Sequence, residues 1–100
     1  MPELTGTQKK HLRGIAHGLE PMVRVGQKGL TEEVEREVDR TLARHELVKV
    51  KLAGDRDERR RLAGELARGL EAELVGTIGT IAILFRRNPD PKERKIRLPP

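Results

Sequence analysis

Cysteine is absent from this chain of 100 residues, and its aromatic side chains are reduced to one, Phe85. Without cysteine the chain can form no disulfide bond, no thiolate nucleophile and no zinc or iron–sulfur site built on cysteine. With one aromatic residue it cannot build the surfaces on which RRM sheets and single-strand-binding barrels stack bases. The sequence therefore excludes thiol chemistry and any recognition that depends on several aromatic rings.

Long hydrophobic segments are missing as well. No run approaches the roughly 18 apolar residues that a membrane-spanning helix needs. Residues 1–5 also lack the basic and apolar parts of a secretory signal. We therefore expect a cytoplasmic protein with no membrane partner, and the absence of cysteine fits a reducing compartment.

Charge is abundant and unevenly placed. The chain has 21 Lys or Arg against 16 Asp or Glu, a net charge of +5, with 37% charged and 35% hydrophobic residues. This composition is typical of one folded domain with a heavily solvated surface. The positive excess falls in residues 1–30, 47–54 and 86–100, whereas 31–46 and 55–73 carry more acidic than basic residues. A polyanion is the natural ligand for the basic segments, although solubility alone would also explain the net charge.

Hydrophobic periodicity predicts a chain that alternates helices and strands. Thr5 and Gln8 form a capping box before the first helix, and Gly79-Thr80 suits a type II′ turn between the last two strands. The predicted helices cover about 7–17, the segment from the Thr31 cap to His45, and the segment that Asp55 opens; the predicted strands cover 21–25, 48–52, 73–78 and 81–86.

The element order α-β-α-β-α-β-β predicts an α/β domain with one four-stranded mixed sheet. The second and third helices each have a single apolar stripe, and the strand over 48–52 alternates apolar and basic residues. These patterns favour a two-layer arrangement with one open sheet face, which would display Arg24, Lys49 and Lys51. The domain is expected to cover residues 1–87, followed by a basic, proline-containing tail over 88–100.

Residues 26–29, Gly-Gln-Lys-Gly, lie between a predicted strand and the cap of a predicted helix. Two glycines permit close approach to the backbone, the helix start offers free N–H groups, and Lys28 places a cation at the tip. KH domains hold a nucleic-acid backbone with a GxxG loop in the same general way. A plain strand-to-helix turn also favours glycine, however, and Glu32 and Glu33 compete for the positive helix end. The spacing alone leaves both interpretations open.

Two further patterns are interpreted as structural. A second Gly-x-x-Gly, residues 76–79, carries no basic residue and ends in the predicted hairpin turn. The arginine run 59–61 resembles a binding patch, but Asp55 and Asp57 precede Arg59 and Arg61 by four residues. Such spacing favours ion pairs along one helix.

No catalytic or metal-binding set is visible. His11, His17 and His45 are scattered over two predicted helices, and no Walker loop, nucleophile elbow or calcium loop occurs. We therefore expect a protein without enzymatic activity, without a metal or cofactor, and without a small-molecule substrate.

Several groups of residues carry a resemblance to a known family. They are His11-Leu12-Arg13-Gly14, Leu19-Glu20-Pro21, Val25-Gly26-Gln27-Lys28-Gly29-Leu30-Thr31, His45-Glu46-Leu47-Val48-Lys49-Val50-Lys51, and Ile78-Gly79 before Leu84-Phe85-Arg86. Together, over about residues 4–99, they resemble the CRM domain, named for chloroplast RNA splicing and ribosome maturation. Residues 92–99 further resemble the free-standing bacterial members, the YhbY-type proteins.

The resemblance implies a fold like the C-terminal domain of bacterial translation initiation factor three, with a KH-like, RNA-binding GxxG loop. Plant members act in group II intron splicing, and free-standing bacterial members associate with precursors of the large ribosomal subunit. Besides the loop at 26–29, the matched basic positions are Arg13, Lys49, Lys51 and Arg86. Thr80 departs from the pattern, because relatives often have a basic residue after the hairpin glycine, so an RNA contact at this hairpin is not implied.

These observations lead to the hypothesis of a non-catalytic RNA-binding protein that assists assembly of the large ribosomal subunit. Its partners would be precursor large-subunit ribosomal RNA and the pre-ribosomal particle, recognised through RNA shape and backbone. The predicted RNA-binding residues are Gly26, Gln27, Lys28, Gly29, Lys9, Lys10, Arg13, Arg24, Lys49, Lys51, Arg86 and Arg87.

Other classes stay open. A protein-interaction module could dock on a ribosomal or assembly protein through an extended, exposed tail over 88–100, with incidental RNA contacts. An RNA-modifying enzyme lacks a visible nucleophile or cofactor site, and a double-stranded DNA-binding protein would need a basic recognition helix that is not evident.

Overall fold

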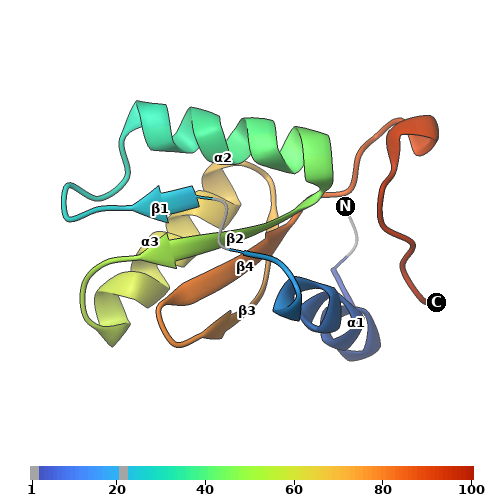
Figure 1. Ribbon diagram of the computed structural model, residues 1–100, viewed down its shortest axis with the longest axis horizontal. Helices are drawn as coiled ribbons and strands as arrows, with labels where there is room; N and C mark the ends of the chain where they lie inside the picture. Colours follow the sequence, from blue (N-terminus) through green and yellow to red (C-terminus); the bar gives the residue numbers. More distant parts are fainter. Residues whose placement is uncertain (1–2, 21–22) are drawn as a thin grey trace.

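The computed structural model describes residues 3–20 and 23–100, and in these ranges the elements follow the predicted order (Figure 1). The helices are α1 (Gly6–His17), α2 (Glu32–His45) and α3 (Arg56–Gly69); the strands are β1 (Val23–Val25), β2 (Leu47–Leu52), β3 (Glu73–Ile78) and β4 (Ile81–Phe85); a 3-10 turn, η1, covers Pro91–Glu93. The α/β class is thus confirmed. The first two residues of the predicted strand over 21–25 lie outside the described residues.

Each helix begins at the cap that the sequence indicates. The Thr5 Oγ1 atom accepts a hydrogen bond from the Gln8 N–H at 3.1 Å, and the Gln8 side chain accepts one from the Thr5 N–H at 3.0 Å. Thr31 and Asp55 likewise accept from the N–H group three positions on, in α2 and α3. These bonds satisfy N–H groups that have no partner inside the helix, and they fix where the chain turns.

The four strands form one mixed sheet in the order β1-β2-β4-β3 (Figure 1). β1 runs parallel to β2, with Val25 opposite Leu52, and β4 runs antiparallel to both β2 and β3. The Leu52 N–H donates to the Thr80 carbonyl at 2.8 Å. The loops 26–29 and 53–55 and the β3–β4 turn therefore meet at one end of the sheet, which we call the loop end.

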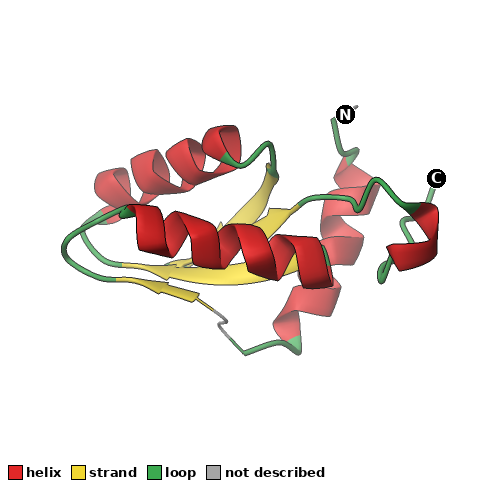
Figure 2. Ribbon diagram, turned by 90° about the horizontal axis from the view of Figure 1, so that it is seen from above, coloured by secondary structure: helices red, strands yellow, loops and turns green. Residues whose placement is uncertain are grey.

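The face of the sheet that contacts α2 and α3 carries the main hydrophobic core (Figure 2). Alternate residues of β2 point to this face, and each is at most 3% exposed: Val48, Val50 and Leu52. Val38 and Leu42 of α2 pack against them. Burial of one such side chain stabilises the fold by about 1.5–3 kcal/mol, so this cluster holds both helices to the sheet.

The opposite face of the sheet is partly covered by α1. Leu12 and Ala16 of this helix form a second buried cluster with Val75, Ile83 and Phe85 of the sheet. α1 thus adds to the predicted two-layer arrangement a partial further layer, over the part of the sheet away from the loop end. The physical reason is that α1 also has an apolar stripe, which must be buried against something.

The open part of this face is consequently smaller than predicted. Arg24 and Lys51 lie opposite each other on β1 and β2 and are exposed, as expected. Lys49 is not displayed, because its ammonium group donates to the carbonyl oxygens of Ala16, at 3.1 Å, and Leu19. Its charge satisfies carbonyl groups at the C-terminal end of α1.

Residues 88–100 fold back onto the domain at the end opposite the loop end (Figure 1). The fully buried carboxylate of Glu46 accepts hydrogen bonds from the N–H groups of Asn88 at 2.6 Å, Lys95 at 2.7 Å and Ile96 at 2.9 Å. The side chains of Ile96 and Leu98 pack against the second cluster. The tail is therefore anchored, and the expectation that it is exposed is wrong at Ile96 and Leu98, whose side chains are partly buried.

Candidate functional site

The glycine loop, residues 26–29, is an exposed turn at the loop end of the sheet. The Gly29 N–H donates to the Gly26 carbonyl at 3.1 Å, which closes the turn with Gln27 and Lys28 at its tip. Both tip residues are exposed. The loop therefore presents one amide and one cation to solvent on a short, closed turn.

The two glycines of this loop play different parts. Gly29 has a φ of 77°, a backbone conformation that other L-residues rarely adopt. Gly26 has no positive φ, and a Cβ built on it would meet no atom within 4 Å. Leu30 packs against the main core and Thr31 caps α2, so the loop rests on a fixed base. The turn needs glycine at 29, whereas glycine at 26 leaves the backbone open to a ligand.

Two further cations stand beside the glycine loop, on the open part of the sheet. Arg24 on β1 lies opposite Lys51 on β2, and both are exposed. Across residues 3–20 and 23–100 the ion pairs are Arg36–Glu32, Arg61–Glu65 and Arg86–Asp39. In the described part of the chain, then, no carboxylate pairs with Arg24, Lys51 or Lys28.

α1 adds positive charge beside β3. A Cβ on Gly76 would stand 3.4 Å from the Arg13 Cδ atom, so the Arg13 side chain lies over this part of the strand. Lys9 precedes Arg13 by four residues and shares its helix face. Lys10 lies toward the tail, where it borders a hollow together with Pro99. Lys9 and Arg13 thus belong to the basic surface near β3, and Lys10 lies apart from it.

Besides Lys10, three predicted RNA-binding residues lie away from the loop end: Lys49, Arg86 and Arg87. Lys49 is held by α1. The Arg86 guanidinium pairs with Asp39 at 2.7 Å and donates to the Leu70 carbonyl at 3.0 Å. Arg86 and Arg87 follow β4 where β2 begins, about 17 Å from the loop end at ~3.3 Å per residue. The engaged charges of Lys49 and Arg86 serve the fold, which speaks against direct phosphate contacts.

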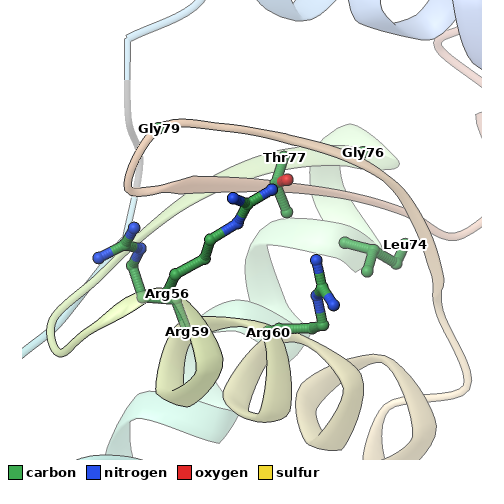
Figure 3. A pocket seen from close by; sticks show the side chains of 7 residues that line it. All are labelled: Arg56, Arg59, Arg60, Leu74, Gly76, Thr77 and Gly79. Atoms are coloured by element: carbon green, nitrogen blue, oxygen red, sulfur yellow. The ribbon is translucent and has the colours of Figure 1, made fainter.

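A second basic feature, which the sequence reasoning missed, lies along the edge strand β3 (Figure 3). A groove of about 560 Å³ separates α3 from β3 and its turn, and we call it the α3–β3 groove. Its lining includes Arg56, Arg59 and Arg60 on the helix side and Gly76, Thr77 and Gly79 on the strand side.

The ion pairs predicted along α3 do not form among the described residues. Arg59 donates to the Gly54 carbonyl at 2.6 Å, and Asp55 is occupied as the cap of the helix. Arg61 pairs with Glu65 at 3.0 Å, on the C-terminal side, rather than with the aspartate before it. A carboxylate four residues upstream therefore does not identify the partner of these arginines, because helix caps and backbone carbonyls compete for the same groups.

A better signal for the groove was present in the sequence. Arg56 and Arg60 are four residues apart, which places two cations on one helix face. The same series continues to Leu52 and Gly64, neither of which carries a charge. The absence of an acidic residue from this series distinguishes this helix face from the face on which Arg61 pairs with Glu65.

The described ranges show neither a metal centre nor a membrane span. No three His, Asp or Glu side chains of these residues group as ligands, and none of the helices there is both long and apolar enough to cross a bilayer. His11, His17 and His45 are exposed.

Comparison with known sequences agrees with this architecture. Residues 4–86 match the family model of the CRS1 / YhbY (CRM) domain. The chain is 46% identical over 91 residues to a Pseudomonas aeruginosa protein named a probable RNA-binding protein, covering 90% of this chain and 88% of the relative. It is 43% identical over 100 residues to a Haemophilus influenzae protein named an RNA-binding protein, covering 99% and 98% of the two chains.

A solved structure has the same fold. The solution structure of a hypothetical protein from Staphylococcus aureus, described as a candidate RNA-binding protein, matches with a TM-score of 0.81 and 33% identity. The match covers 95% of this chain and 100% of that one.

Proposed function

The chain belongs to the CRS1 / YhbY (CRM) domain family, and from this premise we propose that it is a non-catalytic RNA-binding protein whose main contact is the loop end of the sheet. The observation that carries the proposal is the exposed tip of the glycine loop, where Lys28 stands near Arg24 and Lys51 with no carboxylate paired to it among the described residues. The names of the relatives support the same class of ligand.

The geometry of the loop suits a phosphate group. Lys28 supplies a point charge at the tip, and the Arg24 guanidinium can hold two phosphate oxygens at once. The missing side chain at Gly26 lets a phosphate or ribose approach the backbone. Glu32 and Glu33 occupy the first turn of α2, so an anion is repelled from the helix axis and directed to the tip.

Recognition by shape and backbone fits the rest of the molecule. Phe85 is the one aromatic residue of the chain and is 0% exposed, so no aromatic ring is available for stacking on bases. Structured RNA is commonly recognised through its backbone and groove shape rather than by stacking. The proposed ligand is therefore a folded RNA.

Within this class, we propose precursor large-subunit ribosomal RNA as the target and assembly of the pre-ribosomal particle, in the cytoplasm, as the role. The support is the resemblance to free-standing bacterial members of the family. Ultraviolet crosslinking in the protein's own cells tests this assignment. Recovery of precursor large-subunit RNA is expected, and recovery of messenger or intron RNA instead would overturn the role while keeping the RNA-binding chemistry.

Reversing the charge at the tip of the loop tests the contact itself. We expect Lys28→Glu to weaken binding of a labelled large-subunit ribosomal RNA fragment by about tenfold or more, because it removes one phosphate contact and adds repulsion. The melting temperature should stay within about 2 °C, since the side chain is exposed. Fluorescence anisotropy and thermal unfolding measure the two effects.

Lys92→Glu is the matched control, because Lys92 is exposed on η1, at the end opposite the loop end, and the charge change is the same. An equal loss of affinity in both variants would mean that only net charge matters. A large fall in melting temperature for Lys28→Glu would mean that the loop is a structural turn.

The protein-docking alternative has weaker support. It placed the partner on residues 88–100, but Ile96 and Leu98 are committed to the protein's own second cluster and the backbone is held by Glu46. This leaves RNA as the favoured ligand.

A further inference from the structure

We propose that the α3–β3 groove is a second RNA-binding site, which holds the phosphodiester backbone of a strand that also contacts the glycine loop. The inference rests on the proposed function and extends it to the other edge of the sheet. β1 and β3 are the two edge strands, and the glycine loop follows the first while the groove lies along the second.

The charge of the groove is suited to phosphate. Three arginines line its helix side, and no carboxylate is among the lining residues (Figure 3). None of the three forms an ion pair within residues 3–20 and 23–100. Planar guanidinium groups bind phosphate oxygens in pairs, which a lysine does not do.

One of these arginines is already held in place. Arg59 is only partly exposed, and its guanidinium donates to the Gly54 carbonyl at 2.6 Å. Arg56 and Arg60 are exposed and flank it one helical turn apart. A guanidinium fixed before the ligand arrives loses less side-chain freedom on binding, so the groove is partly prepared for an anion.

Apart from the side chain of Leu74, the strand side of the groove offers backbone and a hydroxyl group. Gly76 and Gly79 contribute no side chains, and Thr77 contributes a hydroxyl group that can donate or accept. As an edge strand, β3 has one side without a strand partner in the described sheet. The register also shifts between Leu74 and Gly76, which bends the strand beside the groove. A ribose and phosphate can therefore lie close to the backbone.

The position of the groove makes it continuous with the glycine loop. Gly79 belongs to the turn at the loop end, and Arg56 begins α3 directly after the loop 53–55. Four strands spaced by ~4.8 Å place the two edges about 14 Å apart. An RNA strand that crosses the loop end from Lys28 would reach the groove, whose volume of about 560 Å³ lies within the ~300–1,000 Å³ of typical ligand clefts.

The arginines of the groove could serve two other roles, which the experiment must distinguish from RNA binding. Charged side chains beside an edge strand can prevent it from pairing with the edge of another molecule. Alternatively, an acidic peptide would match both the arginines and the free edge. The test must distinguish these two roles from RNA binding.

The test compares two double variants of α3 with the same loss of charge. Arg56→Gln with Arg60→Gln alters the groove, and Arg61→Gln with Arg68→Gln alters exposed arginines that do not line it. Arg59 is left intact because of its bond to Gly54. Binding of the same labelled ribosomal RNA fragment is measured over a series of salt concentrations, and sedimentation reports the oligomeric state.

We expect the groove variant to lose affinity by about tenfold or more, and the slope of log K against log salt to become shallower by about 1.4–1.8, corresponding to two lost phosphate contacts. The control variant should lose less than about threefold at moderate salt. Amide signals of Thr77 and Gly79 should also shift when the RNA is added to the wild-type protein, and a glutamate-rich peptide should not shift them.

Several outcomes would overturn the inference. Equal losses in the two variants would assign the effect to net charge, and self-association of the groove variant with unchanged RNA affinity would assign the arginines to edge protection. Shifts of these amides with the peptide alone would assign the groove to a protein partner. If affinity falls in Lys28→Glu but not in the groove variant, only this inference fails; if wild-type protein binds no RNA, the proposed function fails with it.

Discussion

Gly26 and Gly29 look alike in the sequence, but the structure separates them at the scale of the residue. Gly29→Ala forces an alanine to a φ of 77° and should cost about 1–2 kcal/mol in the free energy of unfolding. Gly26→Ala needs no strained backbone and meets no atom within 4 Å, so stability should be unchanged or higher by up to about 1 kcal/mol. Urea denaturation measures both values.

RNA affinity should be sensitive to a substitution at Gly26 even though stability should not fall. A methyl group at this position would stand between the ligand and the backbone, so we expect Gly26→Ala to weaken RNA binding several-fold in a fully stable protein. Unchanged affinity would show that no ligand approaches the backbone there. An unstable Gly26→Ala variant would contradict the description of the turn.

At the scale of elements, Glu46 joins α2, β2 and the tail. Its carboxylate is 0% exposed and accepts three backbone N–H groups of the tail, and its own backbone has a φ of 66°. Glu46→Gln exchanges one acceptor oxygen for an NH₂ donor facing N–H groups. Hydrogen bonds to a charged group contribute about 1.5–3 kcal/mol, so a loss in that range is expected on urea denaturation.

Glu71 provides a matched control for this prediction. It is the other non-glycine residue with a positive φ in the described ranges, 53°, and it is exposed. Glu71→Gln should leave stability within about 0.5 kcal/mol of wild type. Equal effects of the two substitutions would mean that the buried carboxylate does not hold the tail.

The helices and strands were largely predictable, because the signals that set their ends lie close together in the sequence. The Thr5–Gln8 capping box, the Thr31 and Asp55 caps and the Gly79 turn are set by residues a few positions apart, and each is confirmed. The place of α1 was not predictable from its own stripe. An apolar stripe indicates that one side of a helix is buried, but it does not indicate which face of the sheet packs against that side.

At the scale of the whole molecule, the dependence of RNA binding on salt measures the size of the basic surface. Seven cations are proposed to contact phosphates: Arg24, Lys28 and Lys51 at the loop end, Lys9 and Arg13 on α1 beside β3, and Arg56 and Arg60 in the α3–β3 groove. The slope of log K against log salt should then be about −4.9 to −6.3, a loss on the order of a thousandfold or more between 50 and 200 mM salt. Anisotropy titrations measure it, and a flat response would exclude a phosphate-based interface.

The candidate site could be predicted only in part, because whether a charged side chain is engaged within the fold depends on groups that are distant in the sequence. The glycine loop was evident, since its residues are adjacent in the chain. The alternation of the strand and the family resemblance predict an RNA contact for Lys49, and the resemblance predicts one for Arg86, yet their charges are used by carbonyls at the end of α1, by Asp39 and by Leu70. The spacing of Arg56 and Arg60 indicates the helix side of the α3–β3 groove, but the groove joins two separate elements, and no sequence pattern places β3 beside that helix face.

The position of β1 at the edge of the sheet has a consequence for the motions of the protein. Its described residues, Val23–Val25, pair with one neighbouring strand, β2. Edge segments that pair on one side only open in local fluctuations that leave the rest of the fold intact. The glycine loop follows β1 directly, so the two should open and close together. Binding of a ligand to the glycine loop would then stabilise the paired state of β1. Amide hydrogen exchange in Val23–Val25 would slow on binding, and affinity would fall with any substitution that destabilises β1.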